Sequence, residues 1–313
     1  MVFFPRIAAI SFASTVVLLA ACARNSAPSS AHEHDTMAMP AAAAVPAVGA
    51  PTVGVTDDPT IAPGAASAAA RLNQSPRHGE WVTIKAGPQA GDSLRLWVVY
   101  PQRSTRAPVV IVIHEIFGLS TWVRSVADQL AADGFIAIAP DFLTGKVAVA
   151  PPDTVASQVA MAAIRTLDPE AVQRQIDAAA AYGMALPAAQ PRYGVIGFCW
   201  GGSASFQHAV HSPTLGASVV YYGTSPPSAS LASVKAPVLG LYGGEDARVG
   251  ATIPAADSTM RALGKSYVHE SFAGAGHGFL RGQDDPKTGG ANFAAARRAW
   301  PMTVQFFRTN LER

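Results

Sequence analysis

A cysteine between glycines is the most reactive group that the sequence offers. It lies in Gly197-Phe198-Cys199-Trp200-Gly201, directly after an apolar run at 193–198. A nucleophile on a sharp turn between a strand and a helix needs small residues two positions before and after it. Gly197 and Gly201 meet that need, and the N-terminus of a following helix lowers the pKa of a nearby thiol. The pattern predicts Cys199 as a nucleophile, with a buried structural cysteine as the alternative.

A thiol nucleophile of this kind needs a base, and an acid and a histidine follow downstream in the order typical of such sites. Asp246 comes after the apolar run 238–242, and His277 lies in a glycine-rich loop after the run 267–272. We expect His277 to take the thiol proton and Asp246 to hold the imidazole in the productive tautomer. Glu245 remains a rival acid. The competing histidines, none in a comparable loop, are His78, His114, His208, His211 and His269.

Short apolar runs alternate with helical patterns and must position these groups. Strands are predicted at 82–85, 94–100, 109–113, 135–139, 193–198, 217–222, 238–242 and 267–272, the first two as an antiparallel pair. Helices are predicted at 121–132, 169–184, 203–211, 254–263 and 292–311. This alternation predicts an α/β fold: a doubly wound, mostly parallel sheet with helices on both faces, in a single domain over 76–313.

Six motifs in this order make the chain resemble the dienelactone hydrolase family of α/β hydrolases. They are His114-Glu115-Ile116-Phe117-Gly118, Pro140-Asp141-Phe142, Gly197-Phe198-Cys199-Trp200-Gly201-Gly202, Tyr221-Tyr222-Gly223, Gly243-Gly244-Glu245-Asp246 and Ala275-Gly276-His277-Gly278-Phe279. They span almost the whole catalytic domain, whereas the first 75 residues have no counterpart. The resemblance implies an α/β-hydrolase fold and hydrolysis of small esters or lactones, as by a carboxymethylenebutenolidase, with no metal and no cofactor.

The resemblance also implies roles for residues outside the triad. The backbone amides of Ile116 and Trp200 match the family's oxyanion-hole donors, which stabilise the tetrahedral intermediate. Glu115 matches a carboxylate beside the nucleophile, where it opposes thiolate formation. Arg281 matches an arginine that binds the substrate's carboxylate, so an anionic substrate is expected to gate the thiol. A second family arginine has no clear match in 146–163.

The N-terminus reads as an export signal that ends at a cysteine. Arg6 precedes an apolar run at 7–21, which is short for a membrane span. Leu19-Ala20-Ala21-Cys22 resembles the lipobox of bacterial lipoproteins, so Cys22 is expected to carry a lipid anchor. The protein is then exported and tethered in the cell envelope, on the periplasmic or outer-membrane side in a Gram-negative host. An ordinary secretory signal with an incidental cysteine is the alternative.

A flexible tether is expected over 22–75, because its Ala, Pro, Ser and Thr bury too little apolar surface to offset the entropy of ordering. Inside it, His32-Glu33-His34-Asp35-Thr36-Met37-Ala38-Met39 carries ligands that suit copper. A solvated linker is the simpler interpretation of that segment. If Cys22 is acylated, Cys199 has no disulfide partner, which favours a catalytic use of its thiol.

Composition excludes some functions and leaves others open. A formal net charge of +2 with 14% charged residues favours neither a nucleic-acid partner nor a strongly acidic one. The only partners indicated are a small-molecule ester or lactone and a membrane. A non-catalytic envelope lipoprotein that binds ligands with a hydrolase fold, and metal handling by the 32–39 segment, are the competing functions.

Overall fold

A computed structural model of the chain describes residues 57–87, 92–148 and 155–312. The predicted signal peptide, Cys22 and the 32–39 segment lie outside the described residues. Within those ranges, no helix combines the length and apolar character that crossing a membrane requires.

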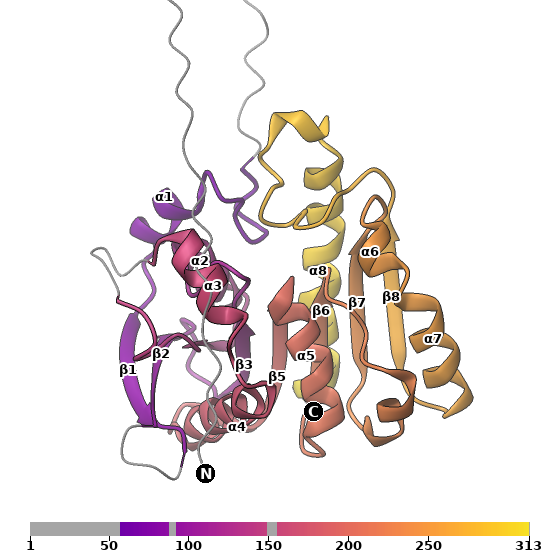
Figure 1. Ribbon diagram of the computed structural model, residues 1–313. Helices are drawn as coiled ribbons and strands as arrows, with labels where there is room; N and C mark the ends of the chain where they lie inside the picture. Colours follow the sequence, from indigo (N-terminus) through magenta and orange to yellow (C-terminus); the bar gives the residue numbers. More distant parts are fainter. Residues whose placement is uncertain (1–56, 88–91, 149–154, 313) are drawn as a thin grey trace, which may run out of the picture. The chain divides into compact units, whose positions relative to one another are not determined.

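Eight strands form one sheet in the order β1-β2-β4-β3-β5-β6-β7-β8 (Figure 1). Strand β2 pairs antiparallel with both β1 and β4, and every other neighbouring pair is parallel. The strands are β1 (Gly79–Lys85), β2 (Ser93–Val99), β3 (Ala107–Ile113), β4 (Ile136–Asp141), β5 (Ala189–Phe198), β6 (Ala217–Tyr221), β7 (Val238–Gly243) and β8 (Tyr267–Phe272). The predicted mostly parallel α/β sheet with a leading antiparallel pair is confirmed.

Burial explains why these residues form these strands. Every residue of β3, Ala107–Ile113, is buried, as is every residue of β4, β6 and β7. Central strands of a parallel sheet are covered on both faces and therefore consist of continuous apolar, often β-branched runs. The edge strand β1 is only half-buried, which suits a strand with one uncovered side.

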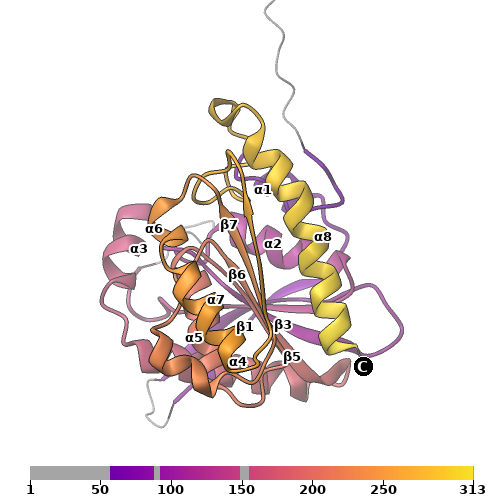
Figure 2. The same ribbon diagram turned by 90° about the vertical axis from the view of Figure 1, so that its right-hand side faces the viewer.

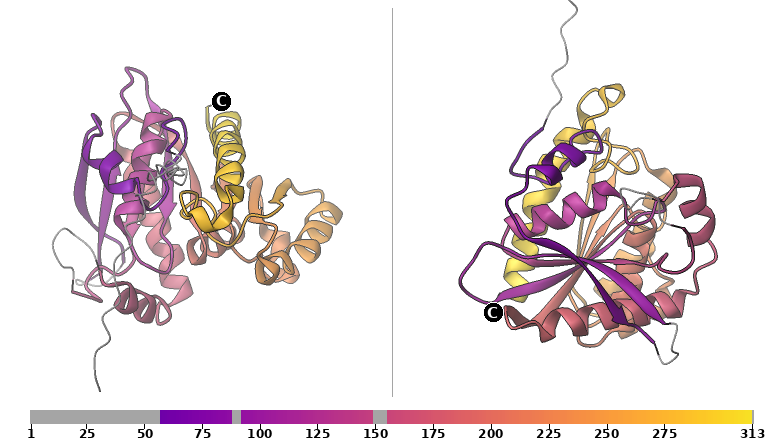
Figure 3. Two further views of the ribbon diagram at one scale, coloured as in Figure 1. Left: turned by 90° about the horizontal axis from the view of Figure 1, so that it is seen from above. Right: turned by 90° about the vertical axis from the view of Figure 1, so that its left-hand side faces the viewer.

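Helices cover both faces of the sheet. Figure 2 shows α8 on one side and α5 and α7 on the other, and Figure 3 shows the twist of the strands between them. The helices are α1 (Ala68–Asn73), α2 (Thr121–Ala132), α3 (Ser157–Ile164), α4 (Pro169–Ala185), α5 (Trp200–His211), α6 (Ala247–Gly250), α7 (Ile253–Ala262) and α8 (Ala291–Leu311), with 3-10 turns η1 (Ser228–Ser233) and η2 (Pro286–Thr288). One core lies under α2 and α8, and a second lies under α4, α5 and α7.

Three short helices, α1, α3 and α6, were not among the predicted elements. In addition, α5 begins at Trp200 instead of residue 203. The glycine pair Gly201-Gly202 looks unfavourable for a helix in sequence. A Cβ at Gly202 would lie 2.4 Å from the Tyr221 carbonyl oxygen, so the close approach to β6 requires glycine inside the first turn.

Residues 57–75, expected to belong to the tether, instead pack on the domain, and we call them the N-terminal strap. Ile61 is 2% exposed and Ala62 is fully buried in the core under α2 and α8. The Trp122 indole N–H donates to the Pro63 carbonyl at 2.9 Å. The few apolar residues of this Ala- and Pro-rich stretch are thus the ones that dock, and the ordered domain extends upstream of residue 76.

The strap also contacts the loop that carries Arg281. The amide of Ala65 donates to the Arg281 carbonyl at 2.8 Å, and the Gln283 side-chain amide donates to the Ala62 carbonyl at 2.9 Å. The amide of Ala66 donates to the Asp284 carboxylate at 2.7 Å. Backbone groups on both segments are therefore satisfied by each other, which fixes the backbone at 281–284.

Candidate active site

Cys199 occupies a strained turn between β5 and α5. Its φ is 57° and its ψ is −115°, in a region that non-glycine residues rarely adopt. The surroundings hold it there, because its amide donates to the Tyr221 carbonyl at 3.1 Å and its carbonyl accepts from Ser203 at 3.1 Å. The strained backbone projects this side chain away from the strand, as in a nucleophile elbow.

The flanking glycines are required by close backbone approach. A Cβ on Gly197 would lie 1.9 Å from the Gly201 carbonyl oxygen, and a Cβ on Gly201 would lie 2.3 Å from the carbonyl oxygen of His114. Real Cβ atoms do not approach this closely, so neither position accepts a side chain without backbone movement. The second contact also brings the end of β3 against the start of α5.

Asp246 and His277 form a direct pair. The Asp246 Oδ2 lies 2.5 Å from the His277 Nδ1, and the other carboxylate oxygen accepts from the Val249 amide at 3.3 Å. The carboxylate is nearly buried, at 6% side-chain exposure, whereas the imidazole is 35% exposed. The acid is thus fixed at the start of α6, and it orients an imidazole whose other nitrogen remains available.

The rival residues are placed elsewhere. Glu245 is exposed, one residue before the carboxylate that holds His277. His208 is buried in a network with Tyr193 and Gln173, and burial lowers its pKa to about 3. The remaining candidates have their own partners: His211 with Asp177, His269 with Asp257, His78 with Glu80, and His114 with the Glu115 carbonyl.

The thiol of Cys199 lies among charges. Burial raises its pKa, the backbone N–H of Trp200 lowers it, and the carboxylates of Glu115 and Asp246 raise it again. Arg248, two residues after Asp246, lowers the thiol's pKa by its positive charge. Sequence reasoning missed Arg248, since only the one-turn helix α6 brings it near the thiol. In the described structure, no hydrogen bond joins this thiol to His277.

Glu115 and Arg281 form an ion pair near the thiol. The Arg281 Nε lies 2.9 Å from the Glu115 Oε1, the carboxyl is 5% exposed, and the guanidinium is 41% exposed. Burial raises the pKa of Glu115 to about 7, although Arg281 opposes this shift. The guanidinium also lies over the Phe117 ring, 4.9 Å from its centroid. Arg281 thus links a buried acid to solvent.

The two expected oxyanion donors lie where their amides are not committed to helix or strand ladders. Trp200 is the first residue of α5, and the first amides of a helix have no intrahelical acceptor. Ile116 lies in the tight turn after β3, closed by the Gly118 amide on the Glu115 carbonyl at 3.1 Å. The Gly201–His114 approach brings these two turns together.

Tyr222 is a site residue that sequence reasoning did not single out. Its φ is 41°, it is fully buried, and its ring meets His277 edge-on at 5.2 Å. Among the described residues its hydroxyl has no hydrogen-bond partner. Burial raises its pKa well above the ordinary value, and the charges of Glu115 and Cys199 add to this rise. Only the Tyr-Tyr-Gly motif hinted at its position.

No group of three or more His, Cys, Asp or Glu side chains that could hold a metal ion occurs in 57–87, 92–148 or 155–312. The arrangement provides a thiol, an oriented imidazole and candidate oxyanion donors. Those are the parts that acyl transfer by nucleophilic catalysis uses.

Comparisons with known proteins agree with this chemistry. The sequence model of the Dienelactone hydrolase family matches residues 94–311. A relative from Salmonella typhimurium, named "Putative carboxymethylenebutenolidase", is 30% identical over 262 residues, which is 79% of this chain and 94% of the relative. A relative from Bradyrhizobium sp, named "Probable 2-oxo-3-(5-oxofuran-2-ylidene)propanoate lactonase", is 30% identical over 74% of this chain and 94% of its own.

Solved structures share the fold. The crystal structure of a dienelactone hydrolase from Anabaena variabilis superposes with a TM-score of 0.55 at 22% identity, covering 75% of this chain and 99% of that one. The described domain therefore has the architecture of that whole protein.

Proposed function

The chain belongs to the dienelactone hydrolase family, and from this premise we propose that it cleaves small esters or lactones through an acyl-cysteine formed on Cys199. Hydrolysis of carboxylic esters or lactones is the activity that its relatives' names carry. One observation supports the finer mechanism most: Cys199 is strained at the elbow while Asp246 holds His277 at 2.5 Å.

In the acylation half-reaction, His277 accepts the proton of the Cys199 thiol, and the sulfur attacks the substrate's carbonyl carbon. The carbonyl oxygen becomes an oxyanion that the amides of Ile116 and Trp200 stabilise. When the intermediate collapses, the bond between the carbonyl carbon and the ester oxygen breaks. The leaving alkoxide takes the proton from His277, and the acyl group remains on sulfur as a thioester.

Deacylation repeats the sequence with water. His277 accepts a proton from water as the hydroxide oxygen attacks the thioester carbon. The carbon–sulfur bond then breaks, the thiolate regains the proton, and the carboxylic acid leaves. Asp246 keeps its hydrogen bond to the imidazole and stabilises the imidazolium in both halves.

Glu115 and Arg281 give this site a gate that responds to anions. In the resting enzyme the Glu115 charge raises the pKa of the thiol. A substrate carboxylate that pairs with Arg281 withdraws the guanidinium from Glu115. Without that cation the buried carboxyl takes up a proton, and its opposition to the thiolate ends. Alkylation of Cys199 by iodoacetamide should therefore speed up when a non-hydrolysable carboxylate is added, and an unchanged rate would sink the gate.

The test of the triad uses the full-length protein and its Cys199→Ala variant. Hydrolysis of p-nitrophenyl acetate and of a dienelactone should fall at least about 10³-fold in the variant, since the acyl acceptor is gone. Trapping the acyl group on Cys199 by acid quench and mass spectrometry would identify the intermediate. Equal activity in both proteins would overturn the cysteine mechanism, and no activity in either would favour the binding-lipoprotein alternative.

We also propose that Cys22 carries a lipid that tethers the exported domain to a membrane. The support is the Leu19-Ala20-Ala21-Cys22 sequence alone. Growth with a labelled fatty acid should label the wild-type protein but not a Cys22→Ser variant. Label in both proteins, or in neither, would contradict this anchor.

A further inference from the structure

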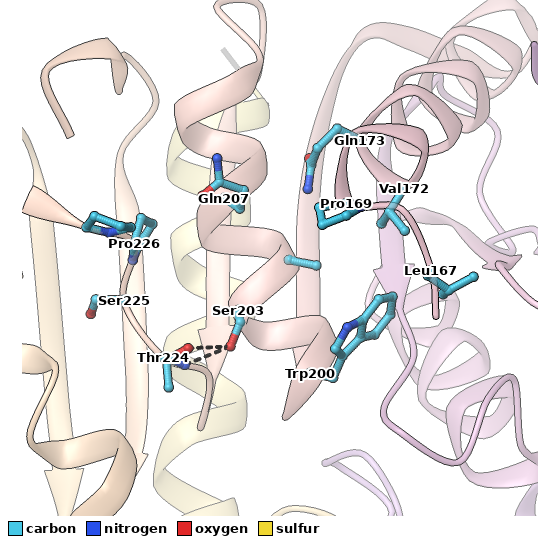
Figure 4. A pocket seen from close by; sticks show the side chains of 12 residues that line it. Leu167, Pro169, Val172, Gln173, Trp200, Ser203, Gln207, Thr224, Ser225 and Pro226 are labelled. Atoms are coloured by element: carbon cyan, nitrogen blue, oxygen red, sulfur yellow. Dashed lines mark hydrogen bonds between the residues drawn. The ribbon is translucent and has the colours of Figure 1, made fainter. Parts of the chain in front are cut away.

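A cavity lies beside the elbow and shares no lining residue with the proposed triad. Its volume is about 290 Å³, and its walls come from the start of α4, the first two turns of α5 and the loop at 224–227. Figure 4 shows Trp200 and Ser203 on α5, with Pro169 and Val172 facing them from the first turn of α4 and Leu167 from just before that helix. We call it the elbow cavity.

The cavity begins next to the nucleophile on two separate elements. Trp200 directly follows Cys199. The 224–227 loop follows Gly223 and Tyr222, whose ring contacts His277. A Cβ on Gly223 would lie 2.2 Å from the carbonyl carbon of Gly202, so that loop lies directly on the first turn of α5. The cavity lining thus begins one residue after Cys199 on α5 and two residues after Tyr222 on the neighbouring loop.

The lining carries no charge. All twelve residues that the structure places around the cavity are apolar or neutral polar. Some of its polar groups are already paired: the Thr224 amide donates to the Ser203 hydroxyl at 2.8 Å, and the Gln173 Oε1 lies 2.8 Å from the Nδ1 of His208 behind the wall. The buried Ser225 hydroxyl has no hydrogen-bond partner among the described residues, so it can bind one polar atom of a ligand. Binding an anion here costs free energy, because the anion loses its hydration and no lining residue is a cation. Binding an alkyl or aryl group is favourable, because its apolar surface leaves water.

The volume sets the size of that group. Small-molecule pockets usually span roughly 300–1,000 Å³, so this cavity suits one part of a substrate. At the roughly 30 Å³ that one water occupies in the liquid, it has room for on the order of ten non-hydrogen atoms.

We propose that the elbow cavity binds an uncharged alkyl or aryl group on one side of the scissile bond, so that the enzyme acts on esters or lactones bearing such a group. This inference rests on the proposed function. The group belongs either to the acyl part or to the leaving alcohol, and both carry the same chemistry. Substrate preference then depends on two regions: Arg281 for a carboxylate, and this cavity for a neutral group.

Two ester series test the proposal and distinguish the two sources. One lengthens the acyl chain from acetate to hexanoate with a fixed alcohol, and the other lengthens the alcohol from methyl to hexyl with a fixed acetyl group. In the wild-type protein one series should gain about fourfold in kcat/KM for each added methylene that the cavity buries. Flat dependence in both series would overturn the proposal.

Filling and opening the cavity should move this preference in opposite directions. Ala204 lines the cavity on α5, so Ala204→Leu should lower the kcat/KM ratio of the longest to the shortest ester about tenfold or more, with methyl acetate within about twofold. Leu167→Ala should extend the preference to longer chains. The matched control is Ala255→Leu on the exposed face of α7, which should leave both series unchanged. An equal loss on all esters in Ala204→Leu would mean a disturbed elbow and would overturn the cavity's role.

Binding without turnover separates the two proposals. Titration calorimetry of the Cys199→Ala protein with the longest ester of the preferred series should show binding that Ala204→Leu weakens about tenfold. Turnover without this difference would leave the acyl-cysteine reaction in place and remove the cavity proposal. If Ala204→Leu weakens binding but the wild-type protein shows no turnover, the cavity proposal would stand and the acyl-cysteine reaction would fall.

Discussion

Two regions adjoin the elbow residue Cys199 in the structure or along the chain, and they differ in charge. The charged cluster consists of Glu115, Asp246, Arg248, His277 and Arg281, and its charges act on the thiol or hold each other. The elbow cavity has no charged lining residue among those that the structure describes. The first region can change the protonation state of the thiol, whereas the second can contribute only contact area. Under the two proposals, reactivity and size selection therefore belong to different parts of the chain.

The largest effect should appear on every substrate alike. Asp246→Asn removes the charge that orients His277 and stabilises its imidazolium, so kcat should fall roughly 10³- to 10⁴-fold. The loss should be the same for acetate and hexanoate esters, because both need the same base. Glu245→Gln, one residue away and exposed, is the control and should keep its activity. A loss confined to one ester would break the division between the two regions.

The next effect concerns stability and belongs to the charged cluster alone. The folded pKa of Glu115 is about 7 against an ordinary 4.5, so the folded state holds that proton more tightly. The Glu115 contribution to stability should therefore be greatest below pH 4.5, fall as the pH rises to 7, and then level off. Buried His208, whose pKa is lowered to about 3, contributes in the opposite direction over the same range. The drop attributable to Glu115 is roughly 3 kcal/mol. Urea unfolding of both proteins at pH 5 and pH 8 isolates the Glu115 contribution: relative to Glu115→Gln, the wild-type protein should lose stability between the two pH values.

Filling the elbow cavity provides the contrast to that measurement. Ala204→Leu should keep the pH dependence of the wild-type protein, since it changes no titratable group. The comparison would fail if Ala204→Leu flattened the curve, or if Glu115→Gln left it intact.

Arg281→Met should separate the regions by substrate. Charged hydrogen bonds contribute roughly 1.5–3 kcal/mol, so kcat/KM for a carboxylate-bearing ester should fall about 10- to 100-fold. Its neutral counterpart of equal length should keep its activity or gain, because without Arg281 the Glu115 carboxyl takes up a proton and no longer opposes the thiolate. Arg192→Met, at an exposed position in β5, serves as the matched control. Equal losses on both esters would show that Arg281 acts through the fold and does not bind the carboxylate.

The smallest effect is expected at Arg248, whose charge lowers the pKa of the thiol. Arg248→Met should shift the pH profile of Cys199 alkylation to higher pH and slow alkylation at pH 7 about threefold. The effect is small because the Arg248 side chain is exposed and solvent screens its charge. Raising the salt concentration should reduce the difference between the two proteins. An unchanged profile would remove Arg248 from the charged cluster.

The parts of the site that could be predicted are those whose structure depends on residues close together in the sequence. The strand, turn and helix around Cys199 follow from the apolar run and the glycines, and chain order placed Asp246 and His277 after them. The elbow cavity could not be predicted in this way, because α4, α5 and the 224–227 loop meet only in the folded sheet. Arg248 was missed for the same reason. The position of the Tyr222 side chain depends on a positive φ, which the neighbouring residue types do not predict.

The amino-acid composition of the N-terminal strap did not predict that it packs on the domain. Counting apolar residues over a long Ala- and Pro-rich window hides two positions, Ile61 and Ala62, that are buried against α2 and α8. Averages over a window describe whether a segment could build its own core. They do not describe whether a few of its side chains fit a core that already exists.

The strap determines where the chain upstream of residue 57 meets the domain. Asp57 and Ala65 are eight residues apart, so even a fully extended chain places them within about 29 Å of each other, and Ala65 bonds directly to Arg281. If Cys22 carries the proposed lipid, the chain from that anchor therefore enters the domain beside the arginine of the proposed gate.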